Sequence, residues 1–160
     1  MDGKIQLDRT DFDIIRILQD NVRISNKQLA ARVNLAPSTC HERVKRLWDL
    51  NVLTGAHAKA DPSVLGVGIS ALLFLVLARH DRAEMDEFVS RIGSIPVVQS
   101  AYFITGTYDA IVHVVARDMG HLRNIVFDHF TNQPEIDRLE TSILYEQIQS
   151  PVIPALHQPG

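Results

Sequence analysis

Residues 25–53 read SNKQLAARVNLAPSTCHERVKRLWDLNVL, and this stretch decides the fold of the N-terminal part of the chain. It carries the start signals of two short helices. Ser25 and Gln28 have the spacing of a capping box, and Asn34 suits the left-handed conformation in which helices end. Pro37 stands where the missing amide of a first helical residue does no harm. Helices joined by a connection of about three residues cross steeply, so the stretch predicts a helix-turn-helix.

The second helix of this pair is expected to have an apolar face and a polar, basic face. At 100° per residue, Cys40, Val44, Leu47 and Asn51 share the core side. Hydroxyl and carboxylate groups on the other sides suit base edges, and Lys or Arg neutralise phosphates. A charge-rich helix face is most often only solvated, but the paired helices favour DNA binding. The candidate DNA contacts are Ser38, Thr39, His41, Glu42, Lys45 and Arg46, with Asn26 and Lys27 near the phosphates.

A further helix is predicted before this pair. Asp8 is placed to cap its N-terminus. Ile14, Ile15, Leu18 and Val22 form an apolar stripe at helical spacing, which the next two helices would cover.

Charge is distributed unevenly along the 160 residues. The net charge is −3, but residues 1–60 hold ten Lys/Arg against seven Asp/Glu (+3), and residues 61–160 hold six against twelve (−6). This asymmetry suits a DNA-binding module joined to a module that does not bind DNA. No apolar run reaches the roughly 20 residues of a membrane-spanning helix. The single cysteine, Cys40, and the lack of an export signal at the N-terminus predict a cytoplasmic protein without disulfides.

The C-terminal part alternates between strand and helix patterns. The expected order is a strand over 66–78, a helix capped by Asp81 with Glu84, strands over 97–105 and 110–116, a helix from Asp118, and a strand over 138–147. This order predicts a ferredoxin-like βαββαβ domain, so the fold class is α+β. We predict a helix-turn-helix domain over 1–53, a strand and hinge linker over 54–66, a ferredoxin-like domain over 67–147 and a tail over 148–160.

The first strand of this domain is apolar on both of its alternating faces over 69–78. Two helices cover only one face of such a sheet, so a second copy of the chain is expected to cover the other. We therefore predict a homodimer, assembling further into a tetramer or octamer. Paired copies would also present two recognition helices to double-stranded DNA.

A series of short motifs runs through both parts of the chain. They are Leu7-Asp8, Ile17-Leu18, Arg23-Ile24-Ser25, Leu29-Ala30, Arg43-Val44, Arg46-Leu47, Val97-Val98, Gly106-Thr107-Tyr108-Asp109 and Pro134. In these motifs, over nearly its whole length, the chain resembles the Lrp/AsnC family of transcription regulators. The resemblance implies an N-terminal DNA-binding domain, a C-terminal effector-binding domain, often for amino acids, and dimers stacked into larger assemblies. Ala36 stands where the family commonly has a capping Ser, and Glu135 and Leu139 stand where Gly and Thr are common.

The turn from Thr105 to Asp109 is the candidate effector site. Gly106 allows close backbone approach, Asp109 could accept from an ammonium, and the hydroxyls of Thr105, Thr107 and Tyr108 could orient a carboxylate. The competing interpretation is a plain hairpin turn in which Asp109 binds backbone amides. An effector would be a bound amino acid, with no cofactor.

The sequence shows no catalytic or metal-binding constellation, so we expect a regulator and not an enzyme. His121 and His129 are eight residues apart on one helix, too far to share a metal ion. One alternative is a sirohaem decarboxylase, because that group of enzymes has a similar two-domain architecture. An architectural DNA-binding protein without effector control is the other.

Overall fold

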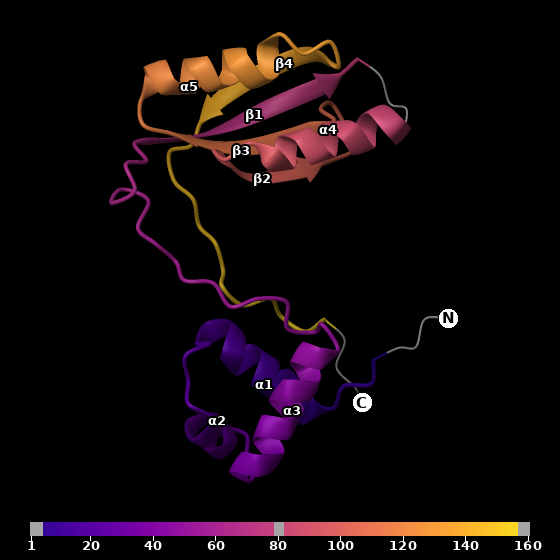
Figure 1. Cartoon of the computed structure of the whole chain (residues 1–160), viewed down its shortest axis with the longest axis vertical. Helices are drawn as coiled ribbons and strands as arrows, with labels where there is room; N and C mark the ends of the chain where they lie inside the picture. Colours follow the sequence, from indigo (N-terminus) through magenta and orange to yellow (C-terminus); the bar gives the residue numbers. More distant parts are fainter. Residues whose placement is uncertain (1–4, 79–81, 157–160) are drawn as a thin grey trace. The chain divides into compact units, whose positions relative to one another are not determined.

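The computed structural model describes residues 5–78 and 82–156, and the chain divides into two compact units. One unit contains the segments Met1–Ala58 and Ile148–Gly160, and the other is Lys59–Gln147 (Figure 1). The tail, predicted as a segment of its own, thus belongs to the first unit. There the Gln19 side chain exchanges two hydrogen bonds with the backbone of Ile153, at 2.8 and 3.3 Å.

Three helices form the first unit: α1 (Arg9–Asp20), α2 (Asn26–Arg32) and α3 (Pro37–Asp49). Asp8 caps α1 and Ser25 caps α2, each in a capping box, as the local patterns require. The connection to α3 passes through Asn34, whose φ of 55° is left-handed. The helix-turn-helix prediction is confirmed.

The core of this unit consists of Ile14, Ile17, Leu29, Ala30, Cys40 and Leu47, all buried. The predicted stripe extended too far at both helix ends. Val22 is exposed because α1 ends at Asp20, and Asn51 lies beyond α3 with a φ of 54°. Periodicity in sequence continues past the point where the backbone stops being helical, which explains both errors.

No strand is present between residues 54 and 68, so the predicted strand in the linker is wrong. A strand needs a neighbouring backbone to pair with. The backbone bonds of this segment are turns, such as the bond from the Val67 amide to the Pro62 carbonyl at 3.0 Å, until Gly68, whose amide donates to the Ala116 carbonyl at 2.9 Å.

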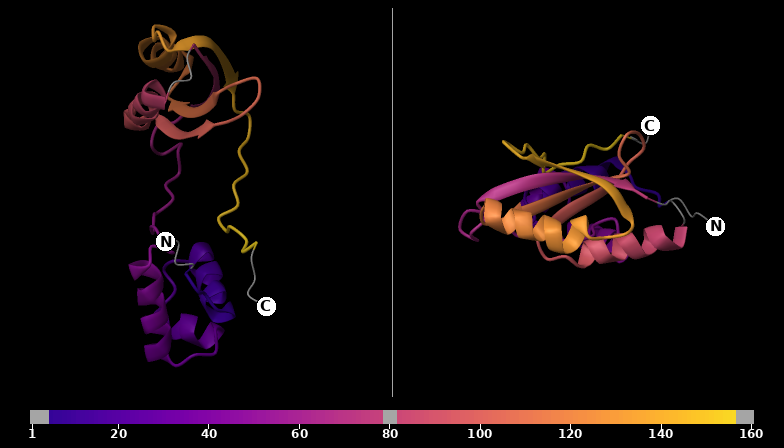
Figure 2. Two further views of the ribbon diagram at one scale, coloured as in Figure 1. Left: turned by 90° about the vertical axis from the view of Figure 1, so that its right-hand side faces the viewer. Right: turned by 90° about the horizontal axis from the view of Figure 1, so that it is seen from above.

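The second unit is the predicted ferredoxin-like domain. Its elements are β1 (Ile69–Leu77), α4 (Arg82–Ser94), β2 (Val98–Phe103), β3 (Ala110–Ala116), α5 (Met119–Val126) with a π-helical continuation over Phe127–Thr131, and β4 (Ile136–Ile143). The four strands pair antiparallel in the order β2-β3-β1-β4. Both helices lie on one face of the sheet (Figure 2, right).

The helix ends in this unit follow local signals, and the strand ends follow pairing. Asp118 caps α5 by accepting from the His121 amide at 2.8 Å, as predicted. The predicted cap of α4 at Asp81 lies outside the described residues. The last strand begins two residues before its predicted start, because Ile136 already pairs with Leu77.

Burial alternates along β1 because only one sheet face is covered. Ala71, Leu73, Leu75 and Leu77 are buried with the helices, together with the β3 residues Val112 and Val114. Leu72, Phe74 and Val76 are half-exposed on the opposite face, which we call the open sheet face. Among the described residues, no helix is long and apolar enough to cross a membrane.

Candidate nucleic-acid interface

The first half of α3 presents an exposed polar surface. Pro37 opens the helix, and its N-cap, Ala36, makes no side-chain hydrogen bond. The predicted contacts Ser38, Thr39, His41, Glu42, Lys45 and Arg46 are all exposed on this helix, and Lys27 is exposed on α2. Seven of the eight candidates are therefore accessible to a partner.

Asn26, the eighth candidate, holds the two helices together. Its side-chain amide donates to the Pro37 carbonyl at 2.7 Å, and the side chain is half-buried. This bond joins the start of α2 to the start of α3. It fixes the position at which α3 begins, and Asn26 thereby positions the exposed polar residues of α3.

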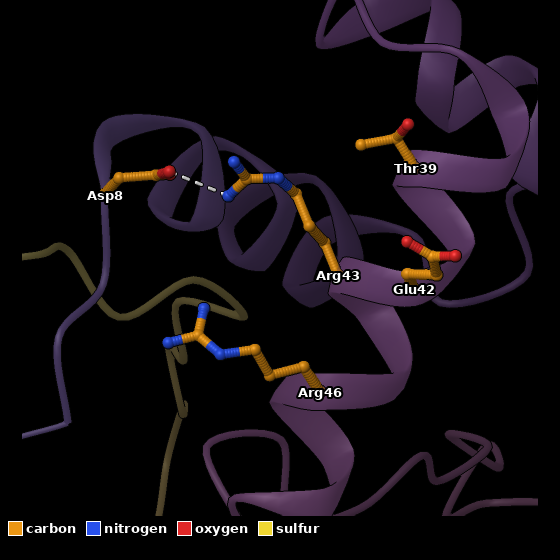
Figure 3. Close-up of a pocket in the computed structure, with 5 residues that line it drawn as sticks. All are labelled: Asp8, Thr39, Glu42, Arg43 and Arg46. Atoms are coloured by element: carbon orange, nitrogen blue, oxygen red, sulfur yellow. Dashed lines mark hydrogen bonds and ion pairs between the residues drawn. The ribbon is translucent and has the colours of Figure 1, made fainter.

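An ion-pair network ties α3 to α1, and its pair between Asp8 and Arg43 is drawn in Figure 3. Arg43 donates to Asp8 and to Asp11, both at 2.8 Å. Arg46 donates to Asp11 at 3.3 Å and to the Gln6 carbonyl at 2.8 Å. Only 1% of Asp11 is exposed. A carboxylate this deeply buried needs such partners, so the network sets the angle between α1 and α3.

The charges in this network stabilise one another. The Asp11 backbone amide and, less strongly, the Arg43 guanidinium hold the pKa of Asp8 below its ordinary value. Hydrogen bonds to Asp8 and Asp11 raise the pKa of Arg43. Because the pKa of Asp8 is depressed on folding, its contribution to stability is present above the ordinary Asp pKa and declines as the pH falls below it.

A shallow hollow of about 360 Å³ lies beside this network, lined by Asp8, Thr39, Glu42, Arg43 and Arg46 (Figure 3). The residues that line it carry both charge signs. The Arg46 side chain is more exposed than that of Arg43, at 46% against 28%. The network was not foreseen from the sequence. Its only sequence signal was the matched spacing: Asp8 and Asp11 are three residues apart, as are Arg43 and Arg46.

The candidate effector turn joins β2 to β3, and its residues differ in their contacts. Thr105, Gly106 and Thr107 are exposed, and Gly106 has a φ of 125°, which L side chains rarely adopt. The Asp109 carboxylate accepts from the Leu77 amide at 2.8 Å, and the Asp109 amide donates to the Leu75 carbonyl at 2.8 Å. Asp109 therefore anchors the turn to the end of β1.

Tyr108, next to Asp109, anchors the same side of this turn. Its hydroxyl donates to Glu140 of β4 at 2.8 Å, which raises the tyrosine pKa. Its ring lies 5.1 Å from that of Phe74, and the Arg138 guanidinium lies 5.5 Å from its centroid. The turn is thus held on the side that leads into β3, and its exposed tip consists of Thr105, Gly106 and Thr107.

Two positions near β4 that depart from the family pattern have structural contacts. Glu135 pairs with Arg91 of α4, which also donates to the His129 carbonyl at 3.0 Å. Leu139 packs against the core of the unit. Within residues 5–78 and 82–156, no group of three or more His, Cys, Asp or Glu side chains could hold a metal ion. Cys40 is buried, and burial raises the pKa of its thiol.

Two family models match the chain, one for each unit. Residues 7–54 match a winged helix-turn-helix DNA-binding model, and residues 70–152 match the Lrp/AsnC ligand binding domain. Together they span both candidate sites.

Curated relatives and solved structures are similar along most of the chain. The HTH-type transcriptional regulator AldR of Mycolicibacterium smegmatis is 36% identical over 143 residues, which is 89% of this chain and 84% of that protein. The transcriptional regulator AzlB of Bacillus subtilis is 34% identical, covering 88% and 89%. The structure of the regulator NMB0573 of Neisseria meningitidis with L-Met has a TM-score of 0.83 at 27% identity, covering 91% and 94%.

Proposed function

The chain belongs to the Lrp/AsnC family and is a DNA-binding transcriptional regulator, and on that basis we propose how its residues share the task. The family and the relatives are regulators and not enzymes, and the sirohaem decarboxylase alternative finds no support among them.

We propose that α3 enters the major groove with Ser38, Thr39, His41, Glu42, Lys45 and Arg46 toward the DNA. The observation that carries this proposal is that α3 presents exposed polar side chains while two of its arginines, Arg43 and Arg46, bond to Asp11 of α1. A recognition helix must hold its side chains in fixed positions to distinguish bases. Lys27 would contact phosphate, and Asn26 would position α3.

Lys45→Ala tests this proposal more clearly than Arg46→Ala, because Arg46 also bonds Asp11 and Gln6 within the unit. DNA fragments would first be selected from a random library by the wild-type protein. For Lys45→Ala we expect weaker binding and a salt slope smaller by about one, as for the loss of one phosphate contact. Lys59→Ala removes the same charge from an exposed residue outside the helices and serves as the control. Equal binding by both variants would reject the proposed interface.

We further propose that the tip of the turn, Thr105 to Thr107, binds an amino acid, with Tyr108 and Asp109 holding the tip in place. The complex of a similar regulator with L-Met and the match to a ligand binding domain support this proposal. Calorimetric titration with the standard amino acids, L-methionine first, tests it.

Thr107→Val keeps the shape of the side chain and removes the hydroxyl, so it should weaken amino-acid binding. Thr54→Val makes the same change at an exposed linker residue and should leave binding unchanged. If no amino acid binds the wild-type chain, this proposal fails, and the architectural DNA-binding alternative becomes the better description.

We also propose that two copies pair through the open sheet face and that such dimers assemble further. The half-exposed apolar side chains that β1 and β3 carry on this face support pairing, because burying apolar surface is favourable. Ile111→Asp places a charge on the face and should yield monomers in sedimentation equilibrium. Met119→Asp places it on exposed α5, on the other side of the sheet, and should still pair. Dimers of Ile111→Asp would contradict the proposal.

A further inference from the structure

One buried polar atom in the second unit has no partner. Among the described residues, Asp11 and His113 are the only polar or charged residues that are buried. Asp11 has three hydrogen-bond donors around it, whereas Nε2 of His113 has no hydrogen-bond partner within the described part of the chain. Buried polar groups without partners are rare because each lacks the hydrogen bonds it would make in water.

The register of the sheet places His113 on the open sheet face. His113 lies in β3 between Val112 and Val114, which are buried on the helix side, so its own side chain points the other way. It pairs with Leu72 of β1 and with Ser100 of β2. Only 8% of His113 is exposed.

No charged side chain on the adjoining strands faces His113. On this face β1 carries Ser70, Leu72, Phe74 and Val76, β2 carries Ser100 and Tyr102, and β3 carries Ile111 and Val115 besides His113. The charged residues of the face, Arg138 and Glu140, stand on β4 beyond β1, where they pair with each other at 3.8 Å. Tyr108, next to them, donates to Glu140. Among the described residues of β1 and β2, which adjoin β3, no carboxylate faces His113; the acidic residues at the end of the face are Asp61 and Glu146, which line a hollow with Ser70.

Burial accordingly lowers the pKa of His113. In a single copy, 8% of His113 is exposed to water. A second copy stacked on this face would exclude that water. By two-fold symmetry it would present the same face, which carries no charged side chain over β1, β2 and β3.

We propose that His113 makes the pairing of two copies through the open sheet face respond to pH, with the neutral imidazole permitting the dimer and the imidazolium opposing it. The inference rests on the proposed pairing through this face. Its linkage has a definite sign. Separated copies bind the proton more readily than the dimer, so falling pH favours separation through the range below the ordinary histidine pKa. At higher pH both states are neutral at this residue, and pairing is unaffected.

Sedimentation equilibrium of the full chain at pH 7.5, 6.5 and 5.5, at constant ionic strength, tests the proposal. An ordinary imidazole is about ten times more often protonated than neutral at pH 5.5, and burial lowers the pKa of His113, so the dimer dissociation constant should rise by less than about tenfold per copy. In His113→Gln, which keeps a polar side chain that does not titrate, this dependence should disappear. His121→Gln changes a histidine of the helix layer and should behave as the wild type.

The outcomes separate the two proposals. If the wild-type chain is monomeric at pH 7.5, pairing through this face fails. If it is dimeric with a dissociation constant that is unchanged at pH 5.5, or if His113→Gln retains the dependence, the role of His113 is overturned.

Should His113→Gln fold poorly by circular dichroism, NMR titration of wild-type His113 replaces it. The pKa of His113 should rise when the protein is diluted below the dimer dissociation constant. A value independent of dilution would overturn the proposal.

Discussion

The exposed side of α3 and the open sheet face are both surfaces for which we propose a partner, but they differ in polarity. The α3 surface is polar, and the ion pairs of Arg43 and Arg46 with the buried Asp11 tie it to α1. The open sheet face is largely apolar over β1 and β3, and Nε2 of the buried His113 has no hydrogen-bond partner among the described residues. Polar side chains without DNA remain hydrated, which costs little free energy. An apolar face lowers the free energy when a partner covers it. The first surface is suited to a reversible charged partner and the second to a lasting apolar one.

The largest effect is expected from a substitution in the core of the first unit, which should impair DNA binding and leave the pairing of copies intact. Leu47→Ala empties a fully buried site in the first unit and should lower its unfolding free energy by about 2–5 kcal/mol. DNA binding should fall, while pairing of copies persists because the second unit has its own core. Urea unfolding followed by the fluorescence of Trp48, the single tryptophan, reports the loss. Leu50→Ala, at an exposed position, should change little. Loss of pairing together with DNA binding would show that the units depend on each other.

A smaller effect is expected from the network that fixes α3. Asp11→Ala removes the shared acceptor of Arg43 and Arg46 and should cost about 2–3 kcal/mol, the range for hydrogen bonds to charged groups. The loss is limited because Arg43 is 28% exposed and regains water. Asp13→Ala breaks only an exposed pair with Arg16 at 3.5 Å and should cost less than about 0.5 kcal/mol. Equal losses in urea unfolding would mean that the network does not hold α3.

The smallest effect concerns the cap that α3 lacks. Ala36 has the extended conformation of an N-cap, with φ −65° and ψ 144°. Ala36→Ser should therefore stabilise the first unit by about 0.5–1 kcal/mol, measured by urea unfolding. Ser25→Ala, which removes the existing cap of α2, should shift stability by a similar amount in the opposite direction. A serine that fails to stabilise would show that the α3 start is restrained by other contacts, such as Asn26.

Local signals carried most of the prediction. Helix ends depend on residues only a few positions apart, so a single sequence reveals them. Examples are the capping box at Ser25, the left-handed Asn34 and the cap at Asp118. The order of strands and helices followed from periodicity, and the sheet topology followed from that order. The errors lay at element ends and in the linker, where pairing with a distant strand, or its absence, decides the outcome.

The candidate sites divide in the same way. Ser38, Thr39, His41, Glu42 and Lys45 were identified because an exposed helix face is readable at 100° per residue. The bonds of Arg46 to Asp11, of Asn26 to Pro37 and of Asp109 to Leu77 were not predicted. These residues lie 11–35 positions apart in the chain, and no local pattern brings their atoms together.

By itself, then, the sequence determined where helices begin, which faces are apolar and that one strand is too apolar for a sheet covered on one side. Only the tertiary structure decided that Asp11 holds both Arg43 and Arg46, that Tyr108 and Asp109 anchor their own turn, and that His113 lies on the open face with no partner for Nε2 among the described residues. The physical reason is range. Caps and periodicity act within one or two turns of the backbone, whereas a charged or polar side chain chooses its partner from whatever the packed elements bring within about 3 Å.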